Sequence, residues 1–184
     1  MTHAEAVEFL SHASPPPGNW ADIGAGTGTF SRALAELIGK GSTVFAIDSD
    51  AAAVRALRRL EQSSAHAGAQ IVSVRGDMLN LPAILELAGA VLAGALFANA
   101  LHFTDVPERV LAQTAERLGP GGRIVVIEYD RREPNAWVPH PLPFDMLTHA
   151  ARAAGIGVPE RVARRPSRFH REMYCAVLSS GAGI

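Results

Sequence analysis

Trp20-Ala21-Asp22-Ile23-Gly24-Ala25-Gly26-Thr27-Gly28 joins the end of an apolar strand to the start of an amphipathic helix. Glycines at alternate positions let the turn adopt positive φ and let backbone N–H groups approach a ligand closely. The N-terminus of the helix that follows favours anionic groups. The helix is predicted from apolar residues that recur on one face before two terminating glycines: Phe30, Leu34, Leu37 and Ile38, then Gly39 and Gly41. This stretch therefore predicts a binding site for a small ligand.

The spacing of the glycines differs from that of dinucleotide-binding oxidoreductases. Their fingerprint is G-x-G-x-x-G, whereas here the third glycine comes one residue early and Thr29 stands in its place. A carboxylate at Asp22 would repel a pyrophosphate but suits a ligand that carries an ammonium group. The turn therefore favours a cationic nucleoside over NAD. An oxidoreductase is kept as the least favoured alternative function.

Two more acids follow the next two predicted strands. Asp48 ends the strand at 44–48, and Asp77 follows the strand at 71–74. Ligands of open α/β sheets bind at the carboxyl edge, and an acid about 20 residues beyond the glycines is placed to accept from ribose hydroxyls. The alternative is structural: Asp48 and Asp50 would cap the next helix, and Asp77 would be a turn residue.

At this point the chain resembles the class I S-adenosylmethionine-dependent methyltransferases. The resemblance runs from about Trp20 to Leu178 and covers most of the 184 residues. Five motifs occur in family order: the Asp-x-Gly-x-Gly-x-Gly loop from Asp22, the acid Asp48, Gly76-Asp77-Met78, Asn99-Ala100-Leu101-His102, and Leu118-Gly119-Pro120-Gly121-Gly122. The resemblance identifies S-adenosylmethionine as the expected cofactor.

The resemblance also assigns cofactor-binding roles. Asp22 would hold the methionine ammonium, directly or through water, while the loop amides and the helix N-terminus face the methionine carboxylate. Asp48 would accept both ribose hydroxyls, Asp77 would accept from the adenine amine, and the Met78 N–H would reach a ring nitrogen. The complete expected set is Asp22, Gly24, Ala25, Gly26, Thr27, Gly28, Asp48, Ser49, Asp77, Met78 and Asn99.

Composition is consistent with one α/β domain. At 184 residues and 48% hydrophobic content the chain can bury one sizeable core, and its net charge of -1 creates no general attraction to nucleic acid or membranes. Cys175 is the single cysteine and is expected to be buried in a reducing compartment. With no visible secretory signal, no membrane span and no metal-ligand spacing among scattered histidines, we expect a cytoplasmic protein without a metal site.

The element pattern predicts a Rossmann-like, doubly wound, mostly parallel seven-stranded sheet with an antiparallel C-terminal hairpin. We divide the chain into an N-terminal cap helix and linker (1–18), a cofactor-binding core (19–130), and an acceptor-side segment, helix and hairpin (131–184). Helices are expected at 3–12, 50–60, 106–118 and 144–154, a loop and buried strand within 87–98, and strands at 123–128, 160–165 and 173–178. Asp105, Pro107 and Glu108 mark the start of the 106–118 helix, and Gly119 its end.

Several methyl acceptors can be set aside. The chain lacks the Asn/Asp-Pro-Pro-aromatic turn that follows the fourth strand in enzymes methylating exocyclic or amide nitrogens. Lys40 is the only lysine, so the Lys-Asp-Lys-Glu tetrad of ribose 2′-O-methyltransferases cannot form, and Cys175 is in the wrong strand to attack a pyrimidine. What remains resembles the small-molecule methyltransferases with Asn-Ala-Leu-His after the fourth strand, several of which act on oxygen or carbon. This resemblance implies a small-molecule oxygen or carbon acceptor, with catalysis mainly by positioning.

The acceptor site is predicted from residues after the fourth and fifth strands. Asn99 and His102 would face the methyl group, where His102 either takes the acceptor's proton or hydrogen-bonds backbone or cofactor. Arg131 and Arg132 would hold an anionic acceptor, or pair on the surface with Asp130 and Glu133. The expected wall is Phe9 from the N-terminal helix with Tyr129, Arg131, Arg132, Trp137 and His140.

Two other functions stay open at this point. One is a non-catalytic, cofactor-binding or partner-regulating module. The other is an RNA methyltransferase that uses an arginine-rich tail, formed by Arg161, Arg164, Arg165, Arg168 and Arg171. Because no large lid is inserted, a small acceptor or a pocket completed in a homodimer is also consistent with the chain.

Overall fold

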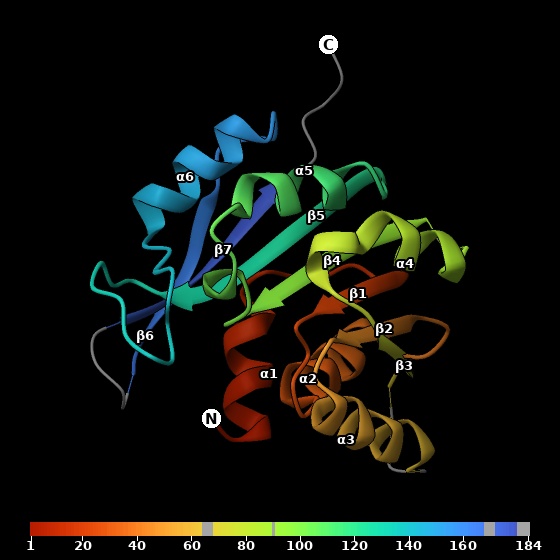
Figure 1. Ribbon diagram of the computed structural model, residues 1–184. Coiled ribbons are helices and arrows are strands. Elements are labelled where there is room, and N and C mark those ends of the chain that lie inside the picture. The colour runs from red at the N-terminus through yellow and green to blue at the C-terminus, as the bar shows by residue number, and fades with distance from the viewer. Residues whose placement is uncertain (64–67, 90, 168–171, 180–184) are drawn as a thin grey trace.

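A computed structural model describes residues 1–63, 68–89, 91–167 and 172–179. The strands in these ranges form a single seven-stranded sheet (Figure 1). The strands lie in the order β3-β2-β1-β4-β5-β7-β6, and β7 runs antiparallel to both of its neighbours. This confirms the predicted doubly wound sheet with its antiparallel hairpin. The strands are β1 Asn19–Ile23, β2 Thr43–Asp48, β3 Gln70–Arg75, β4 Leu92–Ala98, β5 Leu118–Tyr129, β6 Glu160–Pro166 and β7 Glu172–Ser179.

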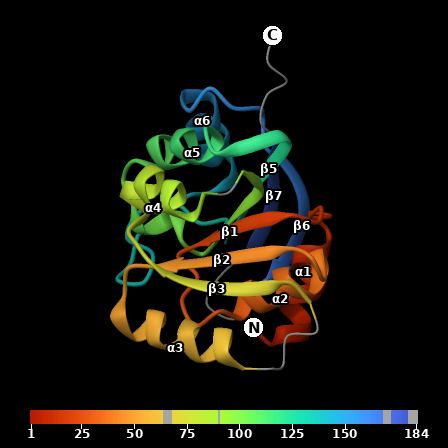
Figure 2. The ribbon, with the colours of Figure 1, turned by 90° about the vertical axis from the view of Figure 1, so that its right-hand side faces the viewer.

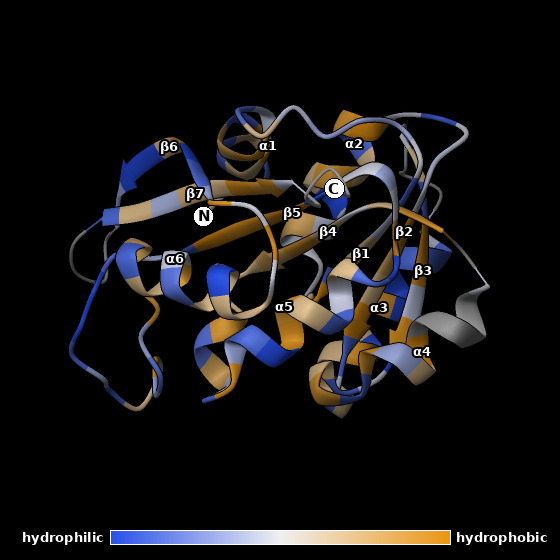
Figure 3. Cartoon of the chain, turned by 90° about the horizontal axis from the view of Figure 1, so that it is seen from above, coloured by the Kyte–Doolittle hydropathy of each residue, from blue (hydrophilic) through white to orange (hydrophobic). Residues whose placement is uncertain are grey.

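Helices cover both faces of the sheet (Figures 1 and 2). Three pack on one face: α1 His3–Ser11, α2 Thr29–Ile38 and α3 Ala51–Gln62. Three pack on the other: α4 Leu81–Ala88, α5 Pro107–Ala115 and α6 Phe144–Ala153. The central strands are apolar along most of their length (Figure 3), as expected of strands that are buried on both faces. Two hydrophobic cores result, one on each side of the sheet.

The helix α4 was not predicted. We expected residues 87–98 to form a loop and a strand, but residues 87 and 88 end a helix, and the strand begins only at Leu92. The segment Pro82-Ala83-Ile84-Leu85-Glu86-Leu87 is short and nearly all apolar. A short apolar run has no clear periodicity, so it cannot distinguish a strand from a buried helix.

The limits of α5 also differ from the prediction. Its N-cap is Val106, with no side-chain capping bond, so Asp105 is not the cap; Pro107 does lie in the first turn, as predicted. The helix ends at Ala115, three residues early, and β5 already begins at Leu118, so Gly119 lies inside a strand instead of ending a helix. Leu118 pairs with Leu92 of β4, so β5 begins before the glycine-rich segment and continues through it.

Other local expectations agree with the structure. Asp50 caps α3, with Oδ1 accepting from the N–H groups of Ala52 (2.9 Å) and Ala53 (2.8 Å). Cys175 is fully buried in β7, and burial raises the pKa of its thiol to about 12.

No helix in the described ranges has the length and apolar character needed to cross a bilayer.

Tyr174 ties the segment after β5 to the sheet. Its buried hydroxyl donates to the Leu142 carbonyl (2.7 Å), and its ring meets Phe144 edge-on at 5.6 Å. We expect Tyr174→Phe to lower the free energy of unfolding by about 1–2 kcal/mol, because the Leu142 carbonyl loses its partner. Thermal denaturation should show a midpoint lower by about 2–8 °C with unchanged cofactor affinity. An unshifted midpoint would mean that this bond adds nothing to stability.

Candidate active site

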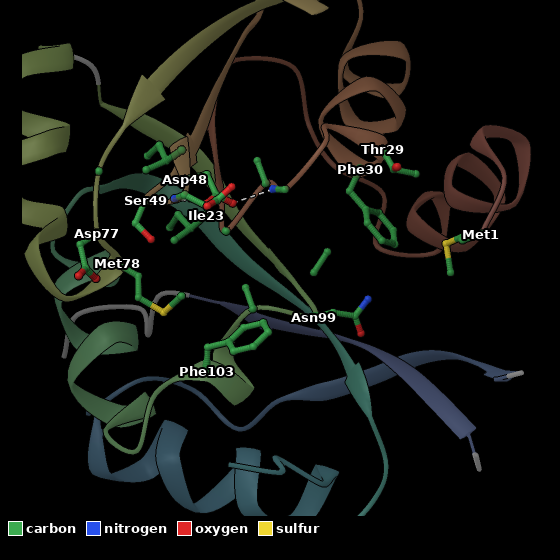
Figure 4. Close-up of a pocket in the computed structure, with 18 residues that line it drawn as sticks. Met1, Ile23, Thr29, Phe30, Asp48, Ser49, Asp77, Met78, Asn99 and Phe103 are labelled. Carbon is green, nitrogen blue, oxygen red and sulfur yellow. Dashed lines mark hydrogen bonds between the residues drawn. The ribbon is translucent and has the colours of Figure 1, made fainter. Parts of the chain in front are cut away.

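A cavity of about 580 Å³ lies at the carboxyl edge of the sheet, beside the point where strand order reverses between β1 and β4 (Figure 4). This is where open α/β sheets bind ligands. Eight of the residues predicted to bind the cofactor line it: Gly24, Ala25, Gly26, Asp48, Ser49, Asp77, Met78 and Asn99. We call it the cofactor cavity. Asp22, Thr27 and Gly28 do not line it.

Two glycines of the loop are required by their surroundings. Gly24 has φ +73°, and a Cβ there would lie 2.6 Å from the Ala100 Cβ. Gly28, the N-cap of α2, has φ +86°, and a Cβ there would lie 2.5 Å from a Leu60 methyl. Positive φ and close approach both select glycine. The loop is therefore packed between the segment after β4 and the helix α3.

Most of the loop amides are occupied within the chain. The N–H groups of Gly24 and Ala25 donate to the Ile47 carbonyl (2.9 and 3.0 Å), and those of Gly26 and Gly28 donate to Asp48 and to the Ala25 carbonyl. We had expected these amides to face the methionine carboxylate. The loop uses them to fix its own shape, which leaves the first turn of α2 as the nearest anion-binding element.

Asp48 and Asp77 are held by backbone donors and also line the cofactor cavity. Asp48 accepts from the N–H of Gly26 at Oδ2 (2.8 Å) and from that of Asp50 at Oδ1 (2.9 Å); Figure 4 marks the first of these bonds. Asp77 accepts from the Leu79 N–H (2.9 Å). The turn and ligand-binding roles of Asp77 are therefore compatible, since each carboxylate oxygen has lone pairs to spare.

Asp22 is the unusual acid of the site. It is 1% exposed, and its Oδ2 accepts from the Ser31 hydroxyl (2.6 Å). Its Oδ1 is buried without a hydrogen-bond partner among the described residues. Burial raises the pKa of Asp22 to about 7 against the opposing Ser31 bond, and the charge of Asp48 adds to the rise. An unpaired buried carboxylate beneath the cavity fits a cofactor that brings an ammonium group.

A second cavity, of about 610 Å³, adjoins the first. Several predicted acceptor-site residues gather around it. It is lined by Asn99, His102, Phe103, Tyr129, Arg131, Asn135, Trp137 and Val138. Two of its aromatic side chains are largely exposed, Trp137 at 81% and Phe103 at 58%. We call it the aromatic cavity.

Three predicted acceptor residues lie elsewhere. Phe9 is packed in the core beneath α1 and is 4% exposed. Arg132 forms a surface ion pair with Asp145 at 2.5 Å. A surface pair was the alternative expected for this arginine, but with Asp130 or Glu133 as the acid. His140 is exposed, and it contacts the site only through its backbone N–H, which donates to the His102 carbonyl (3.0 Å). None of the three lines the aromatic cavity.

Asn99 lies where the cavities meet. It lines the cofactor cavity, the aromatic cavity and a third cavity of about 340 Å³. Its φ is +54°, a conformation few residues other than glycine adopt, and its N–H donates to the Ile127 carbonyl (2.8 Å). Its Oδ1 is buried with no partner in the described ranges. Strained polar residues of this kind are concentrated at functional sites.

His102 is paired with an acid that was not singled out from the sequence. Its Nδ1 lies 2.7 Å from Oε2 of Glu128, and its own backbone N–H donates to Oε1 (3.2 Å). The two side chains are 3% and 1% exposed. The sequence does contain a sign of this pair. Glu128 stands at the end of an otherwise apolar central strand, and a buried carboxylate needs hydrogen-bond partners.

A family comparison gives this geometry its context. The model of the methyltransferase domain family matches residues 21–124, more than half of the chain. The chain belongs to this family. It is an S-adenosylmethionine-dependent methyltransferase, and eight of the eleven residues expected to bind S-adenosylmethionine line the cofactor cavity. No curated protein sequence matches the methyltransferase.

Solved structures of other methyltransferases share the fold. An arsenic(III) S-adenosylmethionine methyltransferase from Chlamydomonas reinhardtii superposes with a TM-score of 0.73 at 17% identity, over 93% of this chain and 66% of that one. Magnesium protoporphyrin IX methyltransferase from Synechocystis with bound SAH gives 0.72 at 14% (97% and 82% covered). The 1,6-didemethyltoxoflavin-N1-methyltransferase of Burkholderia thailandensis gives 0.71 at 19% (97% and 77% covered).

The tail arginines that the structure describes are engaged within the methyltransferase. Arg161 pairs with Asp130 (3.4 Å) and stacks on the Phe144 ring at 4.0 Å. Arg164 pairs with Glu172 (3.4 Å) and Arg165 with Glu5 (3.0 Å). The other two tail arginines, 168 and 171, lie outside the described residues.

The sequence missed several apolar residues of the site. Phe30 and Phe103 line the cofactor cavity together with Ile23, Ile47 and Ala98. Each of these side chains fits an ordinary core pattern, so polarity gives no sign that it faces a ligand. Only the position of Phe103, directly after the Asn-Ala-Leu-His motif, was a usable signal.

Proposed function

We propose that this methyltransferase transfers the methyl group of S-adenosylmethionine to an oxygen or carbon atom of a small molecule bound in the aromatic cavity. The supporting observation is that Asn99 and Phe103 line both the cofactor cavity and the aromatic cavity. Ligands in the two cavities would therefore meet at these residues. A volume of about 610 Å³ suits a small molecule.

The residues of the chain contribute mainly by positioning. S-adenosylmethionine, when bound, supplies an electrophilic methyl group on a positively charged sulfur. Asp48 and Asp77 fix the nucleoside end of the cofactor cavity, and Asp22 balances charge beneath it. Phe103 and Trp137 offer the acceptor two flat, apolar side chains against which it can be positioned. Arg131 is available to an anionic substituent on the acceptor.

The direct experiment is an acceptor screen. Purified protein is incubated with S-adenosylmethionine and a panel of phenols, enols, carbon acids, amines and thiols, and S-adenosylhomocysteine formation is followed. Methylation of oxygen or carbon acceptors supports the proposal. Binding of S-adenosylmethionine without methylation of any small molecule would contradict it and would favour the non-catalytic module; methylation of RNA alone would favour the tail-dependent alternative.

Trp137→Ala tests the aromatic cavity as the acceptor site. Trp137 is 81% exposed, and a bound acceptor would pack against its ring. Loss of this contact should raise KM for the acceptor about tenfold, equivalent to about 1.4 kcal/mol of binding. Cofactor affinity, measured by calorimetry, should stay unchanged. Val158→Ala, which also shortens an exposed apolar side chain (66% exposed), is the matched control and should change neither constant. An unchanged acceptor KM in the Trp137 variant would place the acceptor elsewhere.

A further inference from the structure

Glu128 and His102 form a closely paired unit in the wall of the aromatic cavity. Both oxygens of the Glu128 carboxylate accept from a single residue: Oε2 from the ring Nδ1 of His102 (2.7 Å) and Oε1 from its backbone N–H (3.2 Å). The carbonyl of His102 in turn accepts from the His140 N–H (3.0 Å). His102 is thus held at its imidazole ring, its backbone N–H and its backbone carbonyl, and its side chain is almost fully buried.

This arrangement fixes the tautomer of the imidazole. A carboxylate only accepts, so the proton of the neutral ring must be on Nδ1, and Nε2 keeps its lone pair. His102 lines the aromatic cavity, and its Nε2 has no hydrogen-bond partner among the described residues. His102, which lines the space in which the acceptor would lie, therefore has a ring nitrogen with a free lone pair.

The charges around His102 support a base at this position. Glu128 and Tyr129 come from β5, and Arg131 and His140 from the segment that follows it. Burial, together with the negative charge of Glu128, raises the pKa of Tyr129, so the phenol stays neutral. Glu128 is then the acid that balances an imidazolium when His102 gains a proton, as a buried orienting carboxylate does in hydrolase triads.

We propose that the acceptor is a weakly acidic hydroxyl compound, a phenol or an enol, that Nε2 of His102 takes its proton, and that Glu128 is the positioning residue for His102. This deepens the proposed function and rests on it. A flat ring suits the faces of Phe103 and Trp137, and an acidic hydroxyl is the group that gives up its proton most readily to an imidazole nitrogen.

The reaction balances without any further reactant. The O–H bond of the acceptor breaks and its proton goes to Nε2, while an oxygen electron pair forms the new bond to the methyl carbon. The C–S bond breaks with its electron pair remaining on sulfur. The products are a methyl ether and S-adenosylhomocysteine, and the proton leaves His102 for water after the ether has departed.

The first test needs no acceptor. Long-range ¹H–¹⁵N spectra of the protein bound to S-adenosylhomocysteine should show neutral His102 with its proton on Nδ1. Glu128→Gln keeps an oxygen for the backbone N–H but presents an amide N–H to the ring, so the proton should move to Nε2. A wild-type ring with its proton on Nε2, or a tautomer that is unmoved in the variant, would overturn the proposal.

The second test measures ionisation of a bound probe. 4-Nitrophenol is titrated into the complex with S-adenosylhomocysteine, and the phenolate absorbance is followed at a pH below the probe's own pKa. Binding to the wild type should increase the phenolate fraction, and His102→Asn, which keeps an N–H toward Glu128 but removes Nε2, should abolish the increase. His149→Asn, on the exposed face of α6, is the matched control. Equal ionisation in all three proteins, or no binding of the probe, counts against the proposal.

Turnover separates this inference from the proposed function. With a phenol that the wild type methylates, His102→Asn should lower kcat by about 10²–10⁴-fold, and Glu128→Gln by a smaller factor, while KM for S-adenosylmethionine is unchanged. If the wild type methylates phenols and both variants match it, the base assignment fails and the proposed function stands. If only amines or thiols are methylated, both fail.

Discussion

The Asp22→Asn variant is expected to lose at least about 100-fold in affinity for S-adenosylmethionine and yet to unfold at a higher temperature than the wild type at pH 8. Removing one partner of a buried charge pair costs about 3–5 kcal/mol, and we propose that the buried carboxylate of Asp22 is the partner of the cofactor's ammonium. Without cofactor the same carboxylate destabilises the folded protein, because its Oδ1 has no partner in the described part of the chain. Asparagine keeps an acceptor for Ser31 and carries no charge.

The gain in stability should depend on pH. Asp22 has a pKa of about 7 in the folded protein against 3.8 for an unperturbed carboxyl. Between these values the unfolded state releases a proton that the folded state keeps, so wild-type stability falls as pH rises from about 4 to about 7 and is level above it. The advantage of the variant over the wild type should therefore grow by about 2–3 kcal/mol between pH 5 and pH 8.

Calorimetry and thermal denaturation at several pH values measure both effects. Wild-type cofactor affinity should rise by up to tenfold per pH unit between pH 5.5 and 7 as Asp22 ionises, and the variant should lack this rise. Asp105→Asn makes the same isosteric change at an exposed acid outside the site and is the control. A variant that binds S-adenosylmethionine as well as the wild type would remove Asp22 from the cofactor site.

Gly24→Ala should destabilise the protein and weaken cofactor binding together. A φ of +73° costs an alanine about 1–2 kcal/mol, and the new methyl group would lie 2.6 Å from the Ala100 Cβ. Overpacking of this kind adds about 1–3 kcal/mol. We expect a midpoint lower by about 5–12 °C, and at least a tenfold loss of affinity, because relief of the clash must move either the glycine loop or the segment that carries Asn99.

Two further variants separate strain from collision. Gly26→Ala has a φ of +57° but no atom within 4 Å of the new methyl group, so it should show only the backbone strain. Ala100→Gly removes the atom that Gly24→Ala strikes, and the double variant should recover the collision part of the loss. A double-mutant cycle by chemical denaturation measures this coupling. Strict additivity of the two changes would show that the loop and Ala100 are not in contact.

Much of the cofactor site could be predicted because its residue types carry the chemistry. Asp48 and Asp77 are acids at the ends of parallel strands, and the topology of such a sheet brings these ends to one edge. The structure places both around one cavity with Gly26 and Met78. The sequence left open whether Asp77 is a turn residue or a ligand, and the geometry shows the turn bond while leaving the carboxylate in the lining of the cavity.

The predictions that failed depended on distant partners. The loop amides were assigned to the cofactor from local sequence, but the Ile47 carbonyl, on the neighbouring strand β2, takes those of Gly24 and Ala25. Phe9 was placed at the acceptor because the helix α1 precedes the site, yet α1 turns this side chain into the core against α2 and the sheet. The helix α4 was missed because it is a short, almost wholly apolar run, and such a run does not distinguish a helix from a buried strand.

By itself, the sequence determined the order of the strands and of every helix except α4, the glycine turn and the acids around it, since alternation of elements and the spacing of charged residues are local properties of the chain. Only the tertiary structure decided which polar groups are satisfied within the protein and which are left for a ligand. Two features arise from the packing of separate strands. One is the pairing of His102 with Glu128, 26 positions apart in the sequence; the other is the pair of oxygens, on Asp22 and Asn99, that have no partner among the described residues. No local pattern records them, because a hydrogen bond between segments depends on where the whole sheet places both ends.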